Sequence, residues 1–322
     1  MEGIEPAEVS AETTIRFDDR VAIVTGAGNG LGRCHALGLA ARGAKVVIND
    51  AGGTVDGIGS KGRSAPAERV VAEIEAAGGT AIADTADVTD PAQVAAMVDR
   101  AAQRWGRIDI LVNNAGILRD KSFGKLTLED FRAMMEVHVL GAVHTAKAVW
   151  ERMRTQDYGR IVLTTSSSGL YGNFGQANYG TAKAALIGLM KVLDQEGRKY
   201  DIRANILSPT ATTRMTEALL PEEDRALLDP ASVTPGLLYL VSDEAPSGVM
   251  LCAGAGCFAR AEVVETAGIY LPPEERNPET VARRFGEISA PEGAATLPDA
   301  WAQTKKYVAL AQKAQKSRLG KS

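Results

Sequence analysis

The sequence has few of the residues that mark metal-binding or disulfide-rich proteins. It has three cysteines, Cys34, Cys252 and Cys257, and their spacing suits neither a zinc ribbon nor a disulfide framework. We interpret them as reduced, mostly buried thiols. Of the three histidines, His35 lies far along the chain from the other two. No metal site is therefore predicted.

Long apolar runs and a strong excess of charge are also missing. No stretch approaches the ~18 consecutive apolar residues of a membrane span, and the acidic N-terminus has no apolar core typical of a signal peptide. The last residues, GKS, match no retention or peroxisomal address. The net charge of −4 argues against a nucleic-acid binder. We therefore expect a cytoplasmic protein that acts without nucleic acid or membrane.

Short β-branched runs alternate with longer Ala-rich stretches of helical period. Strands are predicted at 21–25, 44–50, 80–87, 109–115, 160–166, 202–208 and 248–254, and helices at 30–42, 66–78, 91–105, 128–155, 177–199 and 231–242. Near-continuous apolar strands alternating with helices are typical of parallel strands buried on both faces. This predicts the α/β class, with a Rossmann-like doubly wound parallel sheet.

The pattern also predicts three regions. Residues 1–17 are expected to be a flexible arm and residues 18–257 a single catalytic domain. Residues 258–322 are expected to be a C-terminal extension that lines or covers the substrate cavity, with a helix near 298–315. The Gly/Ser-rich residues 51–64 are interpreted as a surface loop.

The first predicted strand runs directly into a glycine-rich turn. The residues of this turn that would contact a cofactor are Gly26, Asn29, Gly30, Leu31 and Gly32. Glycines there permit a tight turn and let backbone N–H groups approach a pyrophosphate at a helix N-terminus. The spacing is not G-x-G-x-x-G, and a turn that only connects strand and helix remains an alternative.

Polar residues follow the next predicted strands. Asp50, 18 residues beyond Gly32, would bind both ribose hydroxyls and repel a 2′-phosphate, which favours NAD over NADP. Asp87 and Val88 would meet the adenine, although a turn or helix N-cap role for Asp87 is equally compatible. Small and amide residues would hold the end of the fourth strand close to the adenosine ribose: Asn114, Ala115 and Gly116.

One spacing indicates acid/base chemistry. Tyr179 and Lys183 are four residues apart and would share a helix face, with Ser166 thirteen positions before the tyrosine. A free tyrosine is a poor base because its pKa is about 10. A nearby positive charge favours the phenolate. Ser166 would then donate a hydrogen bond to the substrate oxygen.

In this order, TGxxxGxG, a strand-end Asp, NNAG, Ser and YxxxK resemble the short-chain dehydrogenase/reductase family over about residues 18–255. The resemblance implies hydride transfer at a carbinol or carbonyl carbon, and Asp50 favours NAD as the cofactor. It implies that Tyr179 is the acid/base, that Lys183 also binds the nicotinamide ribose, and that Ser166 polarises the substrate oxygen. Tyr179 and Lys183 would thus both contact the cofactor. A homodimer or homotetramer is also implied.

Two positions depart from the family pattern. His138 stands where many members carry an asparagine thought to hold a water in a proton relay. A neutral imidazole has the donor and acceptor for this role, and a core histidine bonded to backbone is the alternative. Where the family usually shows Pro-Gly after the sixth strand, this chain has Pro-Thr. Thr212 or Thr213 would bond the nicotinamide carboxamide.

Several segments, 46–53, 114–123, 136–141 and 171–183, resemble one subgroup, the (3R)-3-hydroxyacyl-CoA dehydrogenase modules of peroxisomal multifunctional enzymes of type 2. The resemblance implies oxidation of a 3-hydroxyacyl-CoA, fatty or steroid, to the 3-oxoacyl-CoA in degradation of the β-oxidation type. A hydroxysteroid dehydrogenase acting on free steroid, a 3-oxoacyl carrier reductase and a non-catalytic dinucleotide sensor remain alternatives.

Basic residues are compatible with a CoA ligand. Arg119, Lys121 and Lys125 follow the fourth predicted strand, and the C-terminal tail from Lys305 is basic. They would attract CoA phosphates or simply form a solvated charged surface.

Overall fold

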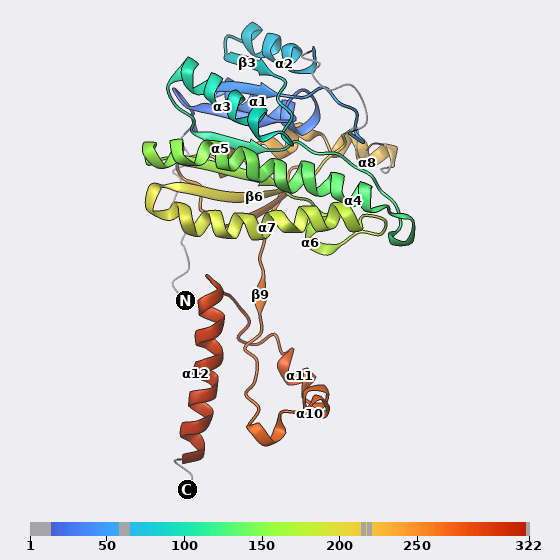
Figure 1. The fold of residues 1–322 in the computed structure, drawn as a ribbon, viewed down its shortest axis with the longest axis vertical. Coiled ribbons are helices and arrows are strands. Elements are labelled where there is room, and N and C mark those ends of the chain that lie inside the picture. Colours follow the sequence, from blue (N-terminus) through green and yellow to red (C-terminus); the bar gives the residue numbers. More distant parts are fainter. Residues whose placement is uncertain (1–13, 58–64, 214–216, 218–220, 320–322) are drawn as a thin grey trace. The chain divides into compact units, whose positions relative to one another are not determined.

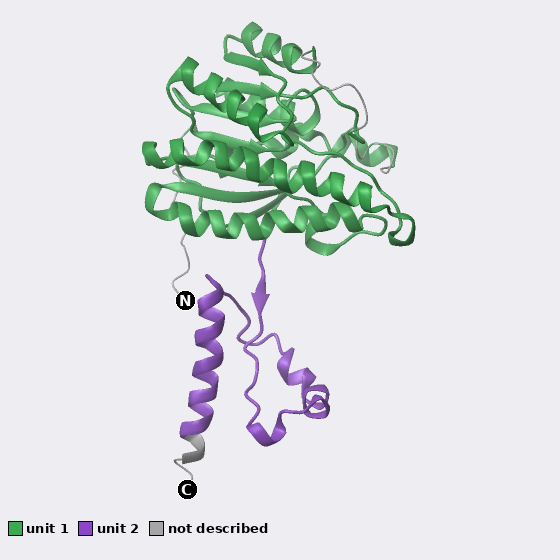
Figure 2. Cartoon of the chain, in the orientation of Figure 1, with its two compact units in different colours: residues 1–260 green, residues 261–322 purple. Residues whose placement is uncertain are grey.

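The computed structural model describes residues 14–57, 65–213, 217 and 221–319, and the chain divides into two compact units, residues 1–260 and 261–322 (Figure 2). This division lies three residues after the predicted boundary at residue 257. Residues 1–13 of the predicted arm and residues 58–64 of the predicted loop lie outside the described residues. The predicted role of the extension in lining the substrate cavity stays a prediction.

The first unit is built on one eight-stranded sheet in the order β3-β2-β1-β4-β5-β6-β7-β8. Its parallel strands are β1 (Val21–Thr25), β2 (Lys45–Asn49), β3 (Thr80–Asp84), β4 (Ile110–Asn113), β5 (Gly159–Thr164), β6 (Ile202–Thr210) and β7 (Met250–Gly254). The predicted doubly wound α/β fold is confirmed. All five residues of β1 are buried, because helices cover both faces of the sheet.

An eighth strand, β8 (Cys257–Ala261), was not predicted. A two-residue turn, Ala255 and Gly256, joins it to β7, and both turn residues have positive φ, 50° and 75°. Such a turn returns the chain along the sheet edge as a hairpin. All five residues of β8 are exposed or half-buried, so the strand lacks the apolar run that identifies the others. The prediction of mostly buried thiols is therefore wrong for Cys257, which is exposed.

Helices lie on both faces of the sheet. The helix α1 packs with α2 and α9, and α3 packs with α5, while α4 packs with α7 (Figure 1). Their bounds are α1 (Gly30–Ala41), α2 (Ala65–Ala76), α3 (Pro91–Trp105), α4 (Leu128–Met134), α5 (Gly141–Gln156), α6 (Ser167–Tyr171), α7 (Ala177–Gly197), α8 (Glu222–Leu227) and α9 (Thr234–Leu240). The predicted helix 128–155 is α4 and α5 joined by a π-helical turn, η2 (Met135–Leu140).

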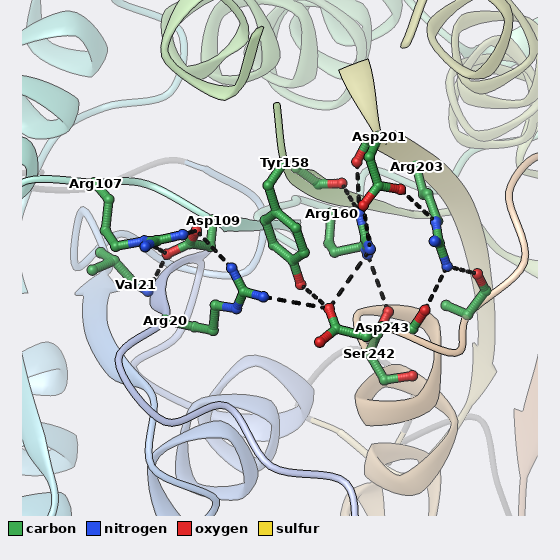
Figure 3. Close-up of polar contacts among 12 residues, drawn as sticks. Arg20, Val21, Arg107, Asp109, Tyr158, Arg160, Asp201, Arg203, Ser242 and Asp243 are labelled. Carbon is green, nitrogen blue, oxygen red and sulfur yellow. Dashed lines mark hydrogen bonds and ion pairs between the residues drawn. The ribbon is translucent and has the colours of Figure 1, made fainter. Parts of the chain in front are cut away.

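Near the amino ends of the strands, a network of arginines and aspartates ties together segments that are far apart in sequence (Figure 3). The Tyr158 ring lies between two guanidinium groups, with 3.7 Å from its centroid to Cζ of Arg20 and 4.2 Å to Cζ of Arg160. Its hydroxyl donates to Asp243 at 2.8 Å. Arg160 is fully buried and also contacts Asp201 at 3.1 Å. A buried charge is tolerated only when it is paired in this way, so the network fixes the amino ends of the sheet.

The second unit contains a short antiparallel pair and three helices. The pair consists of β9 (Val264–Glu265) and β10 (Ala295–Thr296), and the helices are α10 (Pro278–Arg283), α11 (Phe285–Ile288) and α12 (Ala300–Leu319). Lys306 of α12 donates to Glu265 of β9 at 2.8 Å. Over the described part of the whole chain, no helix combines the length and apolarity that crossing a membrane requires.

Candidate active site

A cavity of about 910 Å³ opens at the carboxyl ends of the strands. The strand order reverses at β1, whose neighbours are β2 and β4, and doubly wound sheets bind ligands at such a point. Sixteen of the seventeen predicted site residues line it: Gly26, Asn29, Gly30, Leu31, Gly32, Asp50, Asp87, Val88, Asn114, Ala115, Gly116, His138, Ser166, Tyr179, Lys183 and Thr213. Thr212 is not among the lining residues; its hydroxyl donates to Arg225 O at 3.1 Å.

The glycine-rich turn is held in a shape that only glycine permits. Gly26 has φ +62°, and a Cβ there would lie 2.8 Å from Ala115 Cα. A Cβ at Gly32 would collide with the Gly26 carbonyl. Asn114 Nδ2 donates to Thr25 O at 2.9 Å and to Gly26 O at 3.1 Å, which ties the turn to the end of β4. This close-packed turn at the start of α1 fits the pyrophosphate of a dinucleotide.

Asp50 stands directly after β2 and is tied to the same turn. One carboxylate oxygen accepts from Gly28 N at 2.9 Å and the other from Gly52 N at 2.8 Å. A carboxylate has about four acceptor sites, so both oxygens can still accept from ribose hydroxyls. The geometry therefore fits the predicted ribose contact and adds a structural role for Asp50 in holding the turn.

Asp87 lies three residues beyond the end of β3, which stops at Asp84 rather than continuing to residue 87. Its carboxylate accepts from Thr89 N at 3.0 Å and from Thr89 Oγ1 at 2.9 Å. The N-cap of α3 is Asp90. Asp87 thus makes a turn and also lines the cavity, so a turn role and an adenine contact are both compatible with its position.

Six residues of the segment 51–57, all except Asp56, line the cavity as well, although the sequence indicated only a surface loop. Val55 O accepts from Leu118 N at 3.0 Å, and Arg119 Nε donates to Asp56 O at 2.7 Å. These bonds join the loop after β2 to the loop after β4. Hydrogen bonds between two distant loops have no sequence signature. Only the place of this segment, directly after Asp50, indicated that it lies near the cavity.

Ser166, Tyr179 and Lys183 lie together in the cavity wall. The Ser166 side chain lies close enough to the Tyr179 phenol to act on its pKa, while Ser168, its near neighbour, donates to Gln176 at 2.6 Å. Lys183 is buried, and its Nζ lies 5.6 Å from the centroid of the Tyr179 ring. It donates to Thr164 O at 2.7 Å.

Burial has the largest effect on the pKa values of both Tyr179 and Lys183. It raises the pKa of the Tyr179 phenol; the Ser166 side chain acts in the opposite direction, and the negative charge of Asp120 raises this pKa further. Burial also lowers the pKa of Lys183 to about 7. The expectation that Lys183 brings the phenol pKa down is not met by the protein groups alone, because desolvation of the phenolate outweighs them. An oxidised nicotinamide would supply further positive charge when bound.

His138 lies in the π-helical turn between α4 and α5, and such turns often mark functional sites. Its Nε2 is 2.8 Å from Ile117 O, and its ring meets the Tyr179 ring edge-on with centroids 5.4 Å apart. Burial holds the pKa of His138 well below its usual range, and the Lys183 charge lowers it further. The imidazole is therefore neutral at physiological pH, and it is bonded to backbone as the core-histidine interpretation expects.

A second, very small cavity lies beside it. Its volume is about 10 Å³, near the least that admits one water. His138, Thr164 and Lys183 are among its lining residues. Among the described residues, His138 Nδ1 and Thr164 Oγ1 are buried and have no hydrogen-bond partner. A water at this place would be surrounded by the imidazole of His138, the hydroxyl of Thr164 and the amine of Lys183. It would give His138 Nδ1 and Thr164 Oγ1 the hydrogen-bond partner that each lacks.

Two of the basic residues that the sequence suggested for a CoA ligand form ion pairs within the protein. Arg119 and Lys121 both pair with Asp130, at 3.3 and 2.8 Å. Asp130 lies in the first turn of α4, where a carboxylate is favoured by the helix dipole. Their charge toward a CoA phosphate is therefore partly neutralised.

Comparison with known proteins identifies the family of the chain. The sequence model of the family described as short chain dehydrogenase matches residues 20–224. A putative short-chain type dehydrogenase/reductase of Mycobacterium tuberculosis is 44% identical over 86% of this chain and 96% of its own length. Peroxisomal multifunctional enzyme type 2 of Mus musculus is 44% identical over 85% of this chain and 37% of its own length.

Solved structures are similar too. Full-length peroxisomal multifunctional enzyme type 2 from Drosophila melanogaster has a TM-score of 0.77 and 34% identity, covering 93% of this chain and 50% of its own. A 7α-hydroxysteroid dehydrogenase complexed with NADH and a 7-oxo bile acid conjugate has a TM-score of 0.67 and 30% identity, over 75% and 95% of the two chains. The chain spans 30% to 61% of the length of the curated peroxisomal enzymes that it matches.

Proposed function

The chain belongs to the short-chain dehydrogenase family, and we propose that it oxidises a 3-hydroxyacyl-CoA to the 3-oxoacyl-CoA with NAD. The observation that carries the proposal is the meeting of Ser166, Tyr179 and Lys183 in a cavity that also contains the glycine-rich turn. The resemblance predicted from the sequence is confirmed, and the chain is an oxidoreductase. Members of this family use NAD or NADP.

In the proposed reaction Tyr179 is the general base. As phenolate it takes the proton of the substrate hydroxyl, while Ser166 donates a hydrogen bond to the same oxygen. The chemistry that NAD would supply when bound is acceptance of the hydride from the carbinol carbon. Lys183 is buried with its Nζ 5.6 Å from the centroid of the Tyr179 ring, so in its protonated form it would place positive charge near the phenolate, and it would bind the cofactor ribose. Gly26, Gly32 and the residues around them would hold the pyrophosphate.

The choice of NAD rests on Asp50. Its carboxylate is held at the end of β2 by two backbone N–H groups, where it would repel a 2′-phosphate. We expect Asp50→Asn, which keeps an acceptor for Gly28 but removes the charge, to lower the kcat/KM preference for NAD over NADP by about tenfold. Steady-state kinetics with both cofactors measure this, and an unchanged preference would show that another residue selects the cofactor.

Thr213, which also lines the cavity, would contact the nicotinamide end of the cofactor.

His138 would help to carry the proton taken from the substrate away from the site. We propose that a water between His138 Nδ1, Thr164 and Lys183 carries the proton away from the site. We expect His138→Phe to lower kcat about tenfold, because one group of the path is lost, with little change in the KM for NAD. A kcat equal to that of the unmodified protein would leave His138 as a packing residue.

An acyl-CoA is proposed as the substrate because the chain resembles the dehydrogenase modules of relatives that are named peroxisomal multifunctional enzymes. The second candidate is a free hydroxysteroid, which the structural likeness to a hydroxysteroid dehydrogenase favours. NADH absorbance with 3-hydroxybutyryl-CoA, a steroid-side-chain 3-hydroxyacyl-CoA, a free hydroxysteroid and no substrate distinguishes them. Turnover of the free steroid alone would overturn the CoA assignment. Reduction of 3-oxoacyl carriers is disfavoured by Asp50.

Three further expectations accompany this function. A homodimer or homotetramer is proposed from the family, and sedimentation velocity would distinguish them from a monomer. The cytoplasmic location remains a prediction, and fractionation of cells would test it; several relatives are named as peroxisomal. The proposed contribution of residues 258–322 to the substrate cavity would be seen as a changed KM for acyl-CoA after their removal.

A further inference from the structure

Gln176 is a buried amide in the cavity wall that the chemistry above does not use. Its residue is 6% exposed and lines the cavity. It is the N-cap residue of α7, with φ −123° and ψ 35°, and its carbonyl accepts the first hydrogen bond of the helix, from Gly180 N at 2.7 Å. Gln176 and Tyr179 both line the cavity. Asp120, which accepts from the Gln176 amide, also acts on the Tyr179 phenol and raises its pKa, so the amide and the phenol belong to the same part of the cavity wall.

Three hydrogen bonds fix the orientation of this amide. Its Oε1 accepts from Ser168 Oγ at 2.6 Å and from Asn173 Nδ2 at 3.1 Å, which uses both lone pairs. Its Nε2 donates to the Asp120 carboxylate at 2.7 Å. Because a carboxylate only accepts, the amide cannot be flipped. The second N–H of Nε2 has no protein partner among the described residues and is a preoriented donor.

We propose that this N–H donates to the thioester carbonyl oxygen of the substrate and so selects 3-hydroxyacyl thioesters. The proposal rests on the function proposed above. In such a substrate the hydroxyl and the carbonyl are on alternate carbons, so their oxygens lie side by side. When the hydroxyl oxygen of the substrate binds at Ser166 and Tyr179, its carbonyl oxygen would lie beside the second N–H of Gln176 Nε2. A secondary alcohol without that carbonyl leaves the buried N–H unpaired, which is costly.

The test compares two CoA substrates that differ in one oxygen. The first is 3-hydroxybutyryl-CoA, and the second is the thioether S-(3-hydroxybutyl)-CoA, which has the hydroxyl and the CoA but no carbonyl. The ratio of their kcat/KM values is measured in the unmodified protein and in Gln176→Met, which keeps the side-chain size and removes the donor. Intrinsic reactivity differences between the substrates cancel when the two ratios are compared.

We expect the ratio to fall about tenfold in Gln176→Met, mainly through loss of activity on the thioester. The matched control is Gln103→Met on the exposed surface of α3, which should leave the ratio unchanged. Asp120→Asn provides a second variant, because its amide oxygen can still accept from Gln176 and the ratio should be largely kept. NADH binding and the melting temperature report whether each variant is folded.

The outcomes separate the two proposals. Turnover of 3-hydroxybutyryl-CoA with equal ratios in the unmodified protein and in folded Gln176→Met would overturn the role of Gln176 and leave the function intact. If the unmodified protein does not oxidise 3-hydroxybutyryl-CoA or the longer thioesters, both proposals are wrong. If Gln176→Met does not fold, a kept ratio in Asp120→Asn together with a reduced ratio in Gln176→Glu would support the donor, and an unchanged ratio in Gln176→Glu would overturn it.

Discussion

Tyr179→Phe is expected to lower kcat by about 10³-fold while NADH binding stays within a few-fold of that of the unmodified protein. The substitution removes only the phenol oxygen, and a positioned acid/base contributes about 10²–10⁴-fold. The ring remains, so its edge-on contact with His138 and the packing of α7 are kept. The loss should therefore fall on the chemical step. Single-turnover kinetics and NADH fluorescence measure the two quantities separately.

Tyr171→Phe is a suitable control, because Tyr171 is 76% exposed and lies outside the cavity lining. It loses the same atom from the same residue type and should keep normal kcat. Normal turnover by Tyr179→Phe would show that the acid/base is another group. Loss of NADH binding together with turnover would instead show that the phenol is needed to form the cofactor site.

Local signals made much of the fold predictable. Helix α3 was predicted with its observed bounds, 91–105. In the structure Asp90 caps its first turn, Pro91 begins it and Gly106 ends it with φ 81°, and these residue types are typical of helix ends. The buried strands were found because their apolar runs are bounded by turn residues. The candidate site could be predicted because its residues lie directly after those strands. Parallel strands bring their carboxyl ends, and the residues that follow them, to one edge of the sheet.

Features that depend on interactions between distant segments were not predictable. The role proposed for Gln176 depends on Asp120, which only the folded chain places against its amide. The break in the helix 128–155 arises at a π-helical turn whose residues are ordinary helix formers. The raised pKa of Tyr179 depends on how deeply the ring is buried, whereas the sequence revealed only the neighbouring lysine. Each case needs the tertiary structure to supply a partner or to exclude water.

Lys183→Met is expected to make the protein less active and, at neutral pH, more stable. Burial holds the pKa of Lys183 at about 7, against 10.5 for the exposed group. Between these values the unfolded chain holds a proton that the folded chain has released. Unfolding then takes up a proton, so the free energy of unfolding rises with pH across this window. Methionine has a similar length, carries no charge and removes this pH dependence.

The magnitude follows from the same pKa difference. The unmodified protein should gain about 2 kcal/mol relative to Lys183→Met between pH 7 and pH 9. The lost hydrogen bond to Thr164 O costs about 1 kcal/mol at every pH, so the two stability curves differ in slope as well as in height. Urea unfolding at several pH values measures both.

Lys191→Met is the matched control for this slope. Lys191 lies on the same helix and also donates to a backbone carbonyl, Gly248 O at 3.2 Å, but it is only half-buried. Its substitution should keep the slope of the unmodified protein. Parallel stability curves for the unmodified protein and Lys183→Met would mean that the ammonium is solvated in the folded state. The lysine would then be fully charged at neutral pH, and its positive charge would be available to Tyr179 without the penalty of burial.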